Sequence, residues 1–164
     1  MKTTVLAGGC FWGVEELFLK QIGVSQTRVG YCGGHLPNPS YDDVKTGNTG
    51  HAESIEVQFD PQKTSYKNIF RFFFSIHDPT TPNQQGNDRG SQYRSAIFYQ
   101  SDEEREAAEQ VLSEVQSLGF WKKPIITELI PFEKFYAAED FHQKYLQKNP
   151  GGYTCHFQRY PVGK

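Results

Sequence analysis

One cysteine stands at the junction between a strand-like run and a helix-like run. Cys10 follows two glycines and is followed directly by Phe11 and Trp12. A thiol at a helix N-terminus meets unpaired backbone N–H groups and the positive end of the helix dipole, which favour the thiolate. We therefore expect a lowered pKa for the Cys10 thiol, nucleophilic chemistry at its sulfur, and an apolar wall of two aromatic rings beside it. The alternative is a small buried core residue, as free cysteines often are.

A carboxyl group lies on the apolar face of a predicted strand at residues 52–59. Alternation along this strand places Glu53 on the same face as Ile55 and Val57. Burial disfavours a charged carboxylate, so we expect a raised pKa and a side chain that still holds a proton near neutral pH. If Glu53 instead lies at the end of the strand, it only meets solvent. Together with Cys10, a buried Glu53 predicts attack by a thiol on a group whose departing oxygen needs a proton.

Hydrophobic periodicity and turn residues predict the elements that position these groups. Apolar residues recur at helical spacing after Cys10, Ser65 is placed to cap a second helix, and Ser101 with Glu104 forms a capping box before a third, which Gly119 ends. The predicted strands cover residues 3–7, 24–30, 52–59, 93–99 and 125–130, and the predicted helices cover residues 11–22, 65–76, 101–118 and 137–148.

The order of these elements predicts an α+β protein, a two-layer α/β sandwich with a mixed sheet and with helices mainly on one face. Two long loops, around residues 33–50 and 80–92, interrupt the pattern, and long loops in a compact domain often serve a function. We expect the loops at Cys10, Tyr41 and Asp88 to converge at one end of the sheet.

Length and charge limit the class of protein. The 164 residues suit a single domain over residues 1–164, with an irregular tail from about residue 149. Lys and Arg number 17 against 19 Asp and Glu, and the formal charge of −2 argues against nucleic acid as a partner. The N-terminal apolar run of about five residues is shorter than a secretory signal, and no run is long enough to span a bilayer. With three cysteines and no export signal, we expect a cytoplasmic protein.

Five motifs occur in a fixed order along nearly the whole chain. They are GCFWG at residues 9–13, PNPSY at 37–41, GHAE at 50–53, HDP at 77–79 and QGNDRGSQYRSAI at 85–97. In this order and at these spacings, the chain resembles the peptide methionine sulfoxide reductase A family. The resemblance implies a ferredoxin-like α+β fold and the reduction of the S epimer of methionine sulfoxide, free or in oxidised proteins, to methionine; each epimer has its own enzyme.

The resemblance also assigns roles to residues within these motifs. Cys10 would attack the sulfoxide sulfur, and Glu53 would donate a proton to the sulfoxide oxygen. The remaining roles are hydrogen bonds to that oxygen from Tyr41 and Tyr93, enclosure of the methyl group by Phe11 and Trp12, and orientation of the substrate by Asp88, through water.

Attack of this kind leaves Cys10 as a sulfenic acid, which a second thiol converts into a disulfide. Cys155, in a glycine-rich tail able to swing toward Cys10, is the expected resolving cysteine, although the family's commonest form has cysteine directly after Gly-Tyr. Cys32 is the other candidate, and its alternative role is that of a packed thiol at a strand end. The resemblance implies thioredoxin as the external reductant, with dithiothreitol as a substitute, and no bound cofactor.

Three other functions compete with this one. Cys32, His35, Cys155 and His156 offer four zinc ligands, but their spacing matches no tetrahedral zinc pattern, so we expect no metal. A cysteine peroxidase or a disulfide reductase would also use Cys10, but a disulfide reductase would show a Cys-x-x-Cys motif, which is missing here. A pocket that only binds a methylated or thioether ligand would tolerate replacement of Cys10 by serine.

Overall fold

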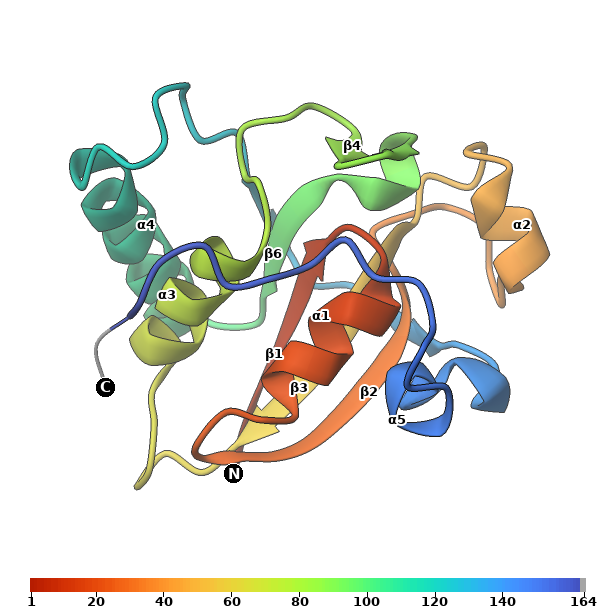
Figure 1. Cartoon of the computed structure of the whole chain (residues 1–164), viewed down its shortest axis with the longest axis horizontal. Helices are drawn as coiled ribbons and strands as arrows, with labels where there is room; N and C mark the ends of the chain where they lie inside the picture. Colours follow the sequence, from red (N-terminus) through yellow and green to blue (C-terminus); the bar gives the residue numbers. More distant parts are fainter. Residues whose placement is uncertain (163–164) are drawn as a thin grey trace.

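A single mixed sheet forms the centre of the computed structural model, which describes residues 1–162 (Figure 1). The strand order is β7-β6-β1-β3-β2-β8. Neighbouring strands pair antiparallel, except that β6 and β7 are parallel, so the predicted mixed sheet is confirmed. The six strands are β1 (Lys2–Gly8), β2 (Val24–Cys32), β3 (Ala52–Phe59), β6 (Ser95–Tyr99), β7 (Glu128–Pro131) and β8 (Phe135–Ala137), and a small separate hairpin joins β4 (Gln84–Gln85) to β5 (Asp88–Arg89).

Three helices cover one face of the sheet, as the element order predicted. Buried side chains of α1 (Phe11–Phe18), α3 (Tyr66–Ile76) and α4 (Asp102–Ser117) join inward-facing strand residues in one large apolar cluster. Two short helices lie elsewhere, α2 (Tyr41–Lys45) and α5 (Tyr145–Lys148). The structure is therefore an α+β sandwich with its main core between the sheet and the helices.

The opposite face of the sheet carries a smaller cluster. Because neighbouring residues of a strand point to opposite faces, the register separates two residues that are adjacent in sequence. Tyr31 pairs with Glu53 and belongs to the helix side, whereas Cys32 pairs with Ala52 and belongs to the small cluster on the other face. Cys32 and Glu53 are thus separated by the sheet.

The predicted helix starts are largely confirmed. The Ser65 side chain accepts a hydrogen bond from the N–H of Asn68, and the Ser101 side chain accepts one from the N–H of Glu104. The second half of the predicted capping box is wrong, because the Glu104 carboxylate accepts the N–H of Gln100 and the hydroxyl of Thr4 instead.

The predicted helix at residues 137–148 is wrong. Phe135–Ala137 forms β8 at the edge of the sheet, and only Tyr145–Lys148 is α-helical. Lys144 interrupts the helical pattern because it adopts a left-handed conformation with φ of 54°, in which its N–H donates to Oε1 of Glu15 over 2.6 Å.

Three other boundaries differ from the prediction. The first helix ends at Phe18 and does not reach Ile22, whose side chain is exposed. The strand expected from residue 125 begins at Glu128, and Tyr93 lies in a short 3-10 helix, Ser91–Tyr93, before β6. Helix α2 was not predicted, because five residues are too few to show a helical period.

The chain after α5 runs back across the helix layer (Figure 1). It passes over α1 and α3 without regular structure up to residue 162, and the N–H of Arg159 donates to the carbonyl of Ser75 over 2.8 Å. Within residues 1–162, no helix is long and apolar enough to cross a membrane.

Candidate active site

Cys10 is the N-cap residue of α1 and follows directly on the turn that ends β1. Gly9 makes this turn with φ of +99°, and a Cβ atom there would lie 2.6 Å from Cγ of Gln85, so both conformation and space require glycine. The predicted strand, turn and helix around Cys10 are therefore present. The Cys10 side chain is packed under its neighbours and retains 8% exposure.

The expected lowering of the Cys10 pKa is wrong for this state. Burial is the largest cause of a strongly raised pKa, and the negative charge of Glu53 adds to it. The backbone N–H of Trp12 acts in the opposite direction and does not compensate. The position at a helix start is as predicted, but desolvation of the sulfur outweighs its effect, so Cys10 is a neutral thiol at rest.

Glu53 faces the helix layer from β3, as the alternation predicted. Its side chain is 2% exposed, and its Oε1 accepts the N–H of Phe11 over 3.2 Å. Burial raises the pKa of Glu53 to about 8; the Phe11 N–H opposes the rise and the negative charge of Asp88 adds to it. A carboxyl group with this pKa is largely protonated at neutral pH, as expected of an acid.

Two segments bring Tyr41, Asp88 and Tyr93 to the same place: Tyr41 begins α2, and Asp88 and Tyr93 lie in the connection between α3 and β6. Burial raises the pKa of Tyr41 to about 12, with further contributions from the charges of Glu53, Cys10 and Asp88. The pKa of Tyr93 is raised by burial first and then by Glu53, Tyr41, Asp88 and Cys10. Glu53, Asp88 and Cys10 thus lie within electrostatic reach of both tyrosine hydroxyls, and the expected convergence of loops is present.

Tyr41 is held by the start of α2. The Ser40 side chain accepts the N–H of Asp43, and the Asp43 carboxylate accepts the N–H of Ser40, which completes a capping box. Because Tyr41 is the first residue after this cap, the cap fixes the direction in which its side chain leaves the helix.

The two aromatic residues after Cys10 differ in burial. Phe11 is 1% exposed and packs in the core against the ring of Tyr31. Trp12 is half-buried, stacks on Tyr145 with ring centroids 3.8 Å apart, and donates its indole N–H to Nδ1 of His142 over 2.9 Å. Trp12 therefore borders the surface beside the cysteine, and Phe11 supports it from within.

Two residues at the site were not predicted. Glu139 accepts the Tyr31 hydroxyl at one carboxylate oxygen (2.9 Å) and the backbone N–H of Tyr41 at the other (3.0 Å). His142 is buried, with its ring 4.6 Å from that of Tyr41. Both lie in the segment that was wrongly predicted as a helix. The chain instead forms β8 and then a 3-10 turn at Asp140–His142, and this path brings both residues to the site.

The two candidate resolving cysteines lie in different surroundings. Cys155 is half-buried in the tail, with its Sγ 3.7 Å from Oδ2 of Asp88 and 3.9 Å from the carbonyl of Gln85. The charge of Cys155 also contributes to the raised pKa of Cys10. Cys32 is 1% exposed on the other face of the sheet. All three cysteines are unpaired.

The zinc alternative lacks a suitable cluster. Among residues 1–162, no three or more His, Cys, Asp or Glu side chains are grouped so that they could hold a metal ion. Cys32 lies beyond the sheet from the tail that carries Cys155 and His156. These residues therefore do not form the four-ligand set considered above.

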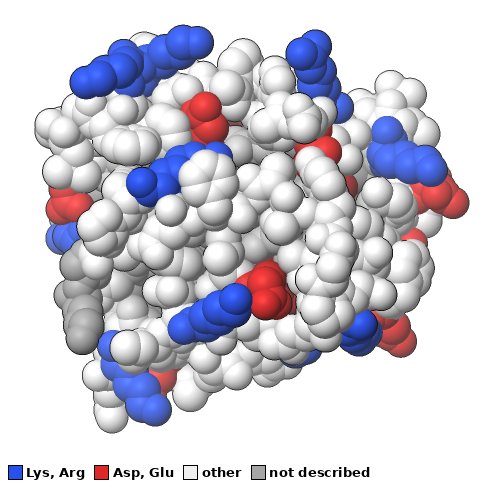
Figure 2. All heavy atoms as spheres, in the orientation of Figure 1, with Lys and Arg blue, Asp and Glu red and all other residues white. Residues whose placement is uncertain are grey.

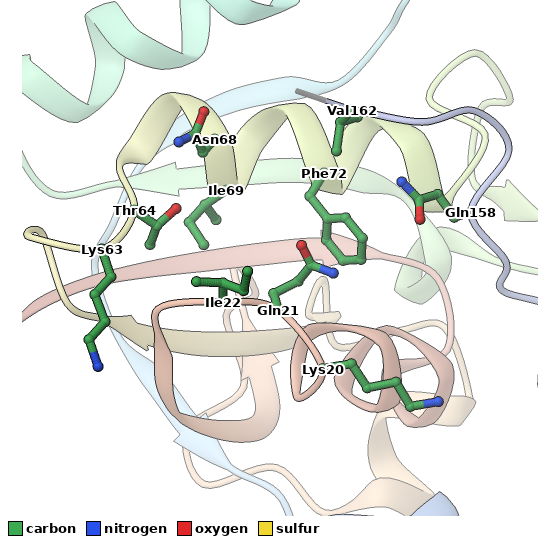
Figure 3. Close-up of a pocket in the computed structure, with 10 residues that line it drawn as sticks. All are labelled: Lys20, Gln21, Ile22, Lys63, Thr64, Asn68, Ile69, Phe72, Gln158 and Val162. Atoms are coloured by element: carbon green, nitrogen blue, oxygen red, sulfur yellow. The ribbon is translucent and has the colours of Figure 1, made fainter. Parts of the chain in front are cut away.

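The face that carries α1 and the tail is mostly uncharged (Figure 2). Lysine and arginine side chains are scattered over it and do not form a continuous basic patch. A cavity of about 410 Å³ opens on the helix layer where the end of α1 meets the start of α3 (Figure 3). It is bordered by Lys20, Ile22, Thr64 and Phe72, and it includes none of the candidate catalytic residues.

Comparison with known proteins gives a consistent result. The sequence profile of the family described as peptide methionine sulfoxide reductase matches residues 2–163. Peptide methionine sulfoxide reductase MsrA 2 of Rhodopirellula baltica is 54% identical over 155 residues, which are 94% of this chain and 90% of that protein.

Solved structures agree with the sequence relatives. The structure of Mxr1 from Saccharomyces cerevisiae in its reduced form superposes with a TM-score of 0.91 at 40% identity, over 97% of this chain and 92% of that one. The same yeast protein in complex with Trx2 gives a TM-score of 0.65 at 27% identity, over 97% of this chain and 90% of that one.

Proposed function

This chain belongs to the peptide methionine sulfoxide reductase family and reduces methionine sulfoxide to methionine, and we propose that Cys10 and Glu53 carry out this reaction as nucleophile and acid. The S epimer is the proposed substrate, either as the free amino acid or in oxidised proteins. Family membership favours this function over a peroxidase, a disulfide reductase or a pocket that only binds its ligand.

The observation that carries this proposal is the hydrogen bond from the Phe11 N–H to Glu53. It joins the residue next to the nucleophile directly to the acid, so the two reacting groups have a fixed relative position. A sulfoxide bound over the first turn of α1 would present its sulfur to Cys10 and its oxygen to Glu53.

In the first step, the Cys10 sulfur attacks the sulfoxide sulfur and forms a sulfur–sulfur bond, while the oxygen receives a proton from Glu53 and the thiol proton replaces it on Glu53. The protonated oxygen then transfers to the Cys10 sulfur as the sulfur–oxygen bond and the new sulfur–sulfur bond break, which releases methionine and leaves Cys10 as a sulfenic acid. No net proton is taken up or released. A neutral thiol and a neutral carboxyl group, which burial favours at Cys10 and Glu53, suit this balance.

The surrounding residues have supporting roles in this proposal. The hydroxyls of Tyr41 and Tyr93 donate hydrogen bonds to the oxygen as negative charge grows on it. Trp12 lines the space for the methyl group, with Phe11 behind it. Asp88 orients the polar part of the substrate, through water.

Cys155 is the proposed resolving cysteine. Its thiol attacks the sulfenic acid sulfur of Cys10, a disulfide forms, and the hydroxyl leaves as water with the thiol proton. The contact of Cys155 with Asp88 supports this role, and the position of Cys32 behind the sheet argues against the alternative. Thioredoxin or dithiothreitol then supplies two electrons and two protons to reopen the disulfide; the complex of the yeast relative with Trx2 supports thioredoxin.

The same chemistry suggests the setting in which the protein works. We propose that residues 1–164 act as one catalytic domain in the cytoplasm, without a bound cofactor. A reducing compartment suits a catalytic thiol that must be returned to its reduced form after each turnover.

Stereopure substrates test the function. The purified protein, with dithiothreitol, is given the S or the R epimer of methionine sulfoxide, free and within a short peptide, and methionine is measured. We expect the S epimer to be reduced in both forms and the R epimer to remain unchanged. Equal reduction of both epimers would contradict the proposed specificity, and reduction of neither would contradict the function.

A further inference from the structure

His156 connects the tail to the catalytic turn. Its side chain is buried, and its Nε2 lies 2.7 Å from the carbonyl oxygen of Gly8, 148 positions earlier in the chain. Because a carbonyl oxygen only accepts, Nε2 carries the proton. Burial lowers the pKa of His156 to about 4, so the ring is neutral and Nδ1 is left as an acceptor.

The second ring nitrogen faces the resolving cysteine. Nδ1 of His156 lies 3.9 Å from Sγ of Cys155, and the backbone N–H of His156 donates to the Thr154 side chain over 3.1 Å. The His156 ring thus contacts Gly8, two positions before Cys10, through one nitrogen and the Cys155 thiol through the other. The Cys155 thiol therefore rests on a residue that is itself fixed to the catalytic turn.

Two glycines on either side of Cys10, Gly9 and Gly13, leave room for this contact. A Cβ atom on Gly13, in the first turn of α1, would lie 2.6 Å from Nδ1 of His156 and would also overlap the Thr154 side chain. A Cβ atom on Gly9 would lie 3.1 Å from Nε2 of the same ring. The tail packs against bare backbone here, at a distance that a larger residue would prevent.

We propose that His156 is a positioning residue for the resolving step: it fastens the reduced tail to the catalytic turn, so that Cys155 is in place before the Cys10 sulfenic acid forms. The proposal rests on Cys155 being the resolving cysteine. From the sequence, the tail was expected to swing freely toward Cys10. In this proposal, the tail is already bound to the turn before Cys10 in the reduced protein. Prior placement of a reacting group accelerates its reaction because the loss of translational and rotational freedom has already occurred.

Single-turnover kinetics separate the two steps. Reduced protein is mixed with excess S sulfoxide without reductant; methionine formation reports the Cys10 step, and loss of free thiols reports disulfide formation. In His156→Leu we expect methionine formation at the wild-type rate and disulfide formation slowed about tenfold, the order expected for one lost hydrogen bond to a buried acceptor. The sulfenic acid should accumulate and be trapped by dimedone.

Two further variants control for folding. His156→Gln keeps an N–H donor near the position of Nε2 and should restore most of the disulfide rate, which a merely space-filling role would not predict. Gly13→Ala keeps the histidine and favours the helix, but its added Cβ would overlap the His156 ring and the Thr154 side chain, so it should slow disulfide formation by pushing the tail off α1.

Two results would overturn the proposal. One is a wild-type rate of disulfide formation in both His156→Leu and Gly13→Ala; the other is an equal fall in both steps, which would assign His156 to the support of Cys10. Cys155→Ser distinguishes these from failure of the underlying function: if it keeps thioredoxin-driven turnover, Cys155 is not the resolving cysteine and the positioning role falls with it.

Discussion

The backbone N–H of Phe11 donates a hydrogen bond to Glu53, 42 positions later in the chain, over 3.2 Å. This N–H belongs to the first turn of α1, where backbone donors have no partner within the helix. From the sequence, the N–H groups at this helix start were expected to stabilise the thiolate of Cys10. The N–H of Phe11 instead donates to the carboxyl group of Glu53. The same bond fixes the carboxyl group of Glu53 beside the nucleophile.

Replacing the acid should remove a pH dependence. Because Glu53 has a raised pKa of about 8, it is protonated below that pH, and its ability to donate falls as pH rises through about 8. We expect kcat/KM of the wild type to decline above pH 8, and Glu53→Gln to lose about 10²–10⁴-fold in rate at neutral pH together with this decline. Activity from pH 6 to 10 is the measurement. Glu56→Gln, on the same strand in an ion pair with Arg28, is the matched control and should keep both.

The same substitution should affect stability in the opposite sense. A raised pKa in the folded state means that the contribution of Glu53 to stability is present at low pH and is lost as pH rises from about 4.5 toward about 8. A tenfold difference in acid strength between the folded and unfolded states corresponds to about 1.4 kcal/mol. The free energy of unfolding of Glu53→Gln, measured in urea at pH 5 and pH 8, should therefore exceed the wild-type value more at pH 8 than at pH 5. An identical difference at both values of pH would argue against a buried neutral carboxyl group.

Three cysteine variants separate attack from recycling. Cys10→Ser should form no methionine with any reductant. Cys155→Ser should form one methionine per enzyme molecule in a single turnover but fail with thioredoxin as the only reductant. Cys32→Ser should behave as the wild type, because Cys32 lies behind the sheet. Methionine formed per enzyme, with and without thioredoxin, is the measurement; full thioredoxin-driven turnover by Cys155→Ser would transfer the resolving role to Cys32.

Removal of either tyrosine hydroxyl that is proposed to donate a hydrogen bond to the sulfoxide oxygen should slow the first step. Tyr41→Phe and Tyr93→Phe keep their rings and lose only the hydroxyl, and we expect each to lower kcat by on the order of 10²-fold, by analogy with the loss of one oxyanion-hole donor. Tyr66→Phe is the control, because Tyr66 packs against Phe59 and Phe70, away from the site. Rates within twofold of the wild type for both variants would contradict the assignment.

Local patterns predicted the central part of the site. A β-branched run, two glycines and a helical period place Cys10 between β1 and α1, and strict alternation places Glu53 on the helix side of β3. The positions of Cys10 and Glu53 depend on residues close to them in the sequence, so they could be predicted without knowledge of the fold.

Features that depend on distant contacts were missed. The segment around Glu139 has helix-forming residues, but pairing of β8 with β2 and the bond from Lys144 to Glu15 override that preference. The pKa of Cys10 was predicted from its helix position alone, whereas its burial arises from loops and a tail that meet only in the folded chain.

The neutral state of Cys10 has a consequence for the resting enzyme. Peroxides and metal ions react with thiolates far faster than with thiols. A sulfur held in its protonated form, with only 8% of its residue exposed, is therefore a poor target for the oxidants that create damaged methionine. We therefore expect the Cys10 thiol of the resting protein to react with peroxide more slowly than an exposed cysteine of ordinary pKa.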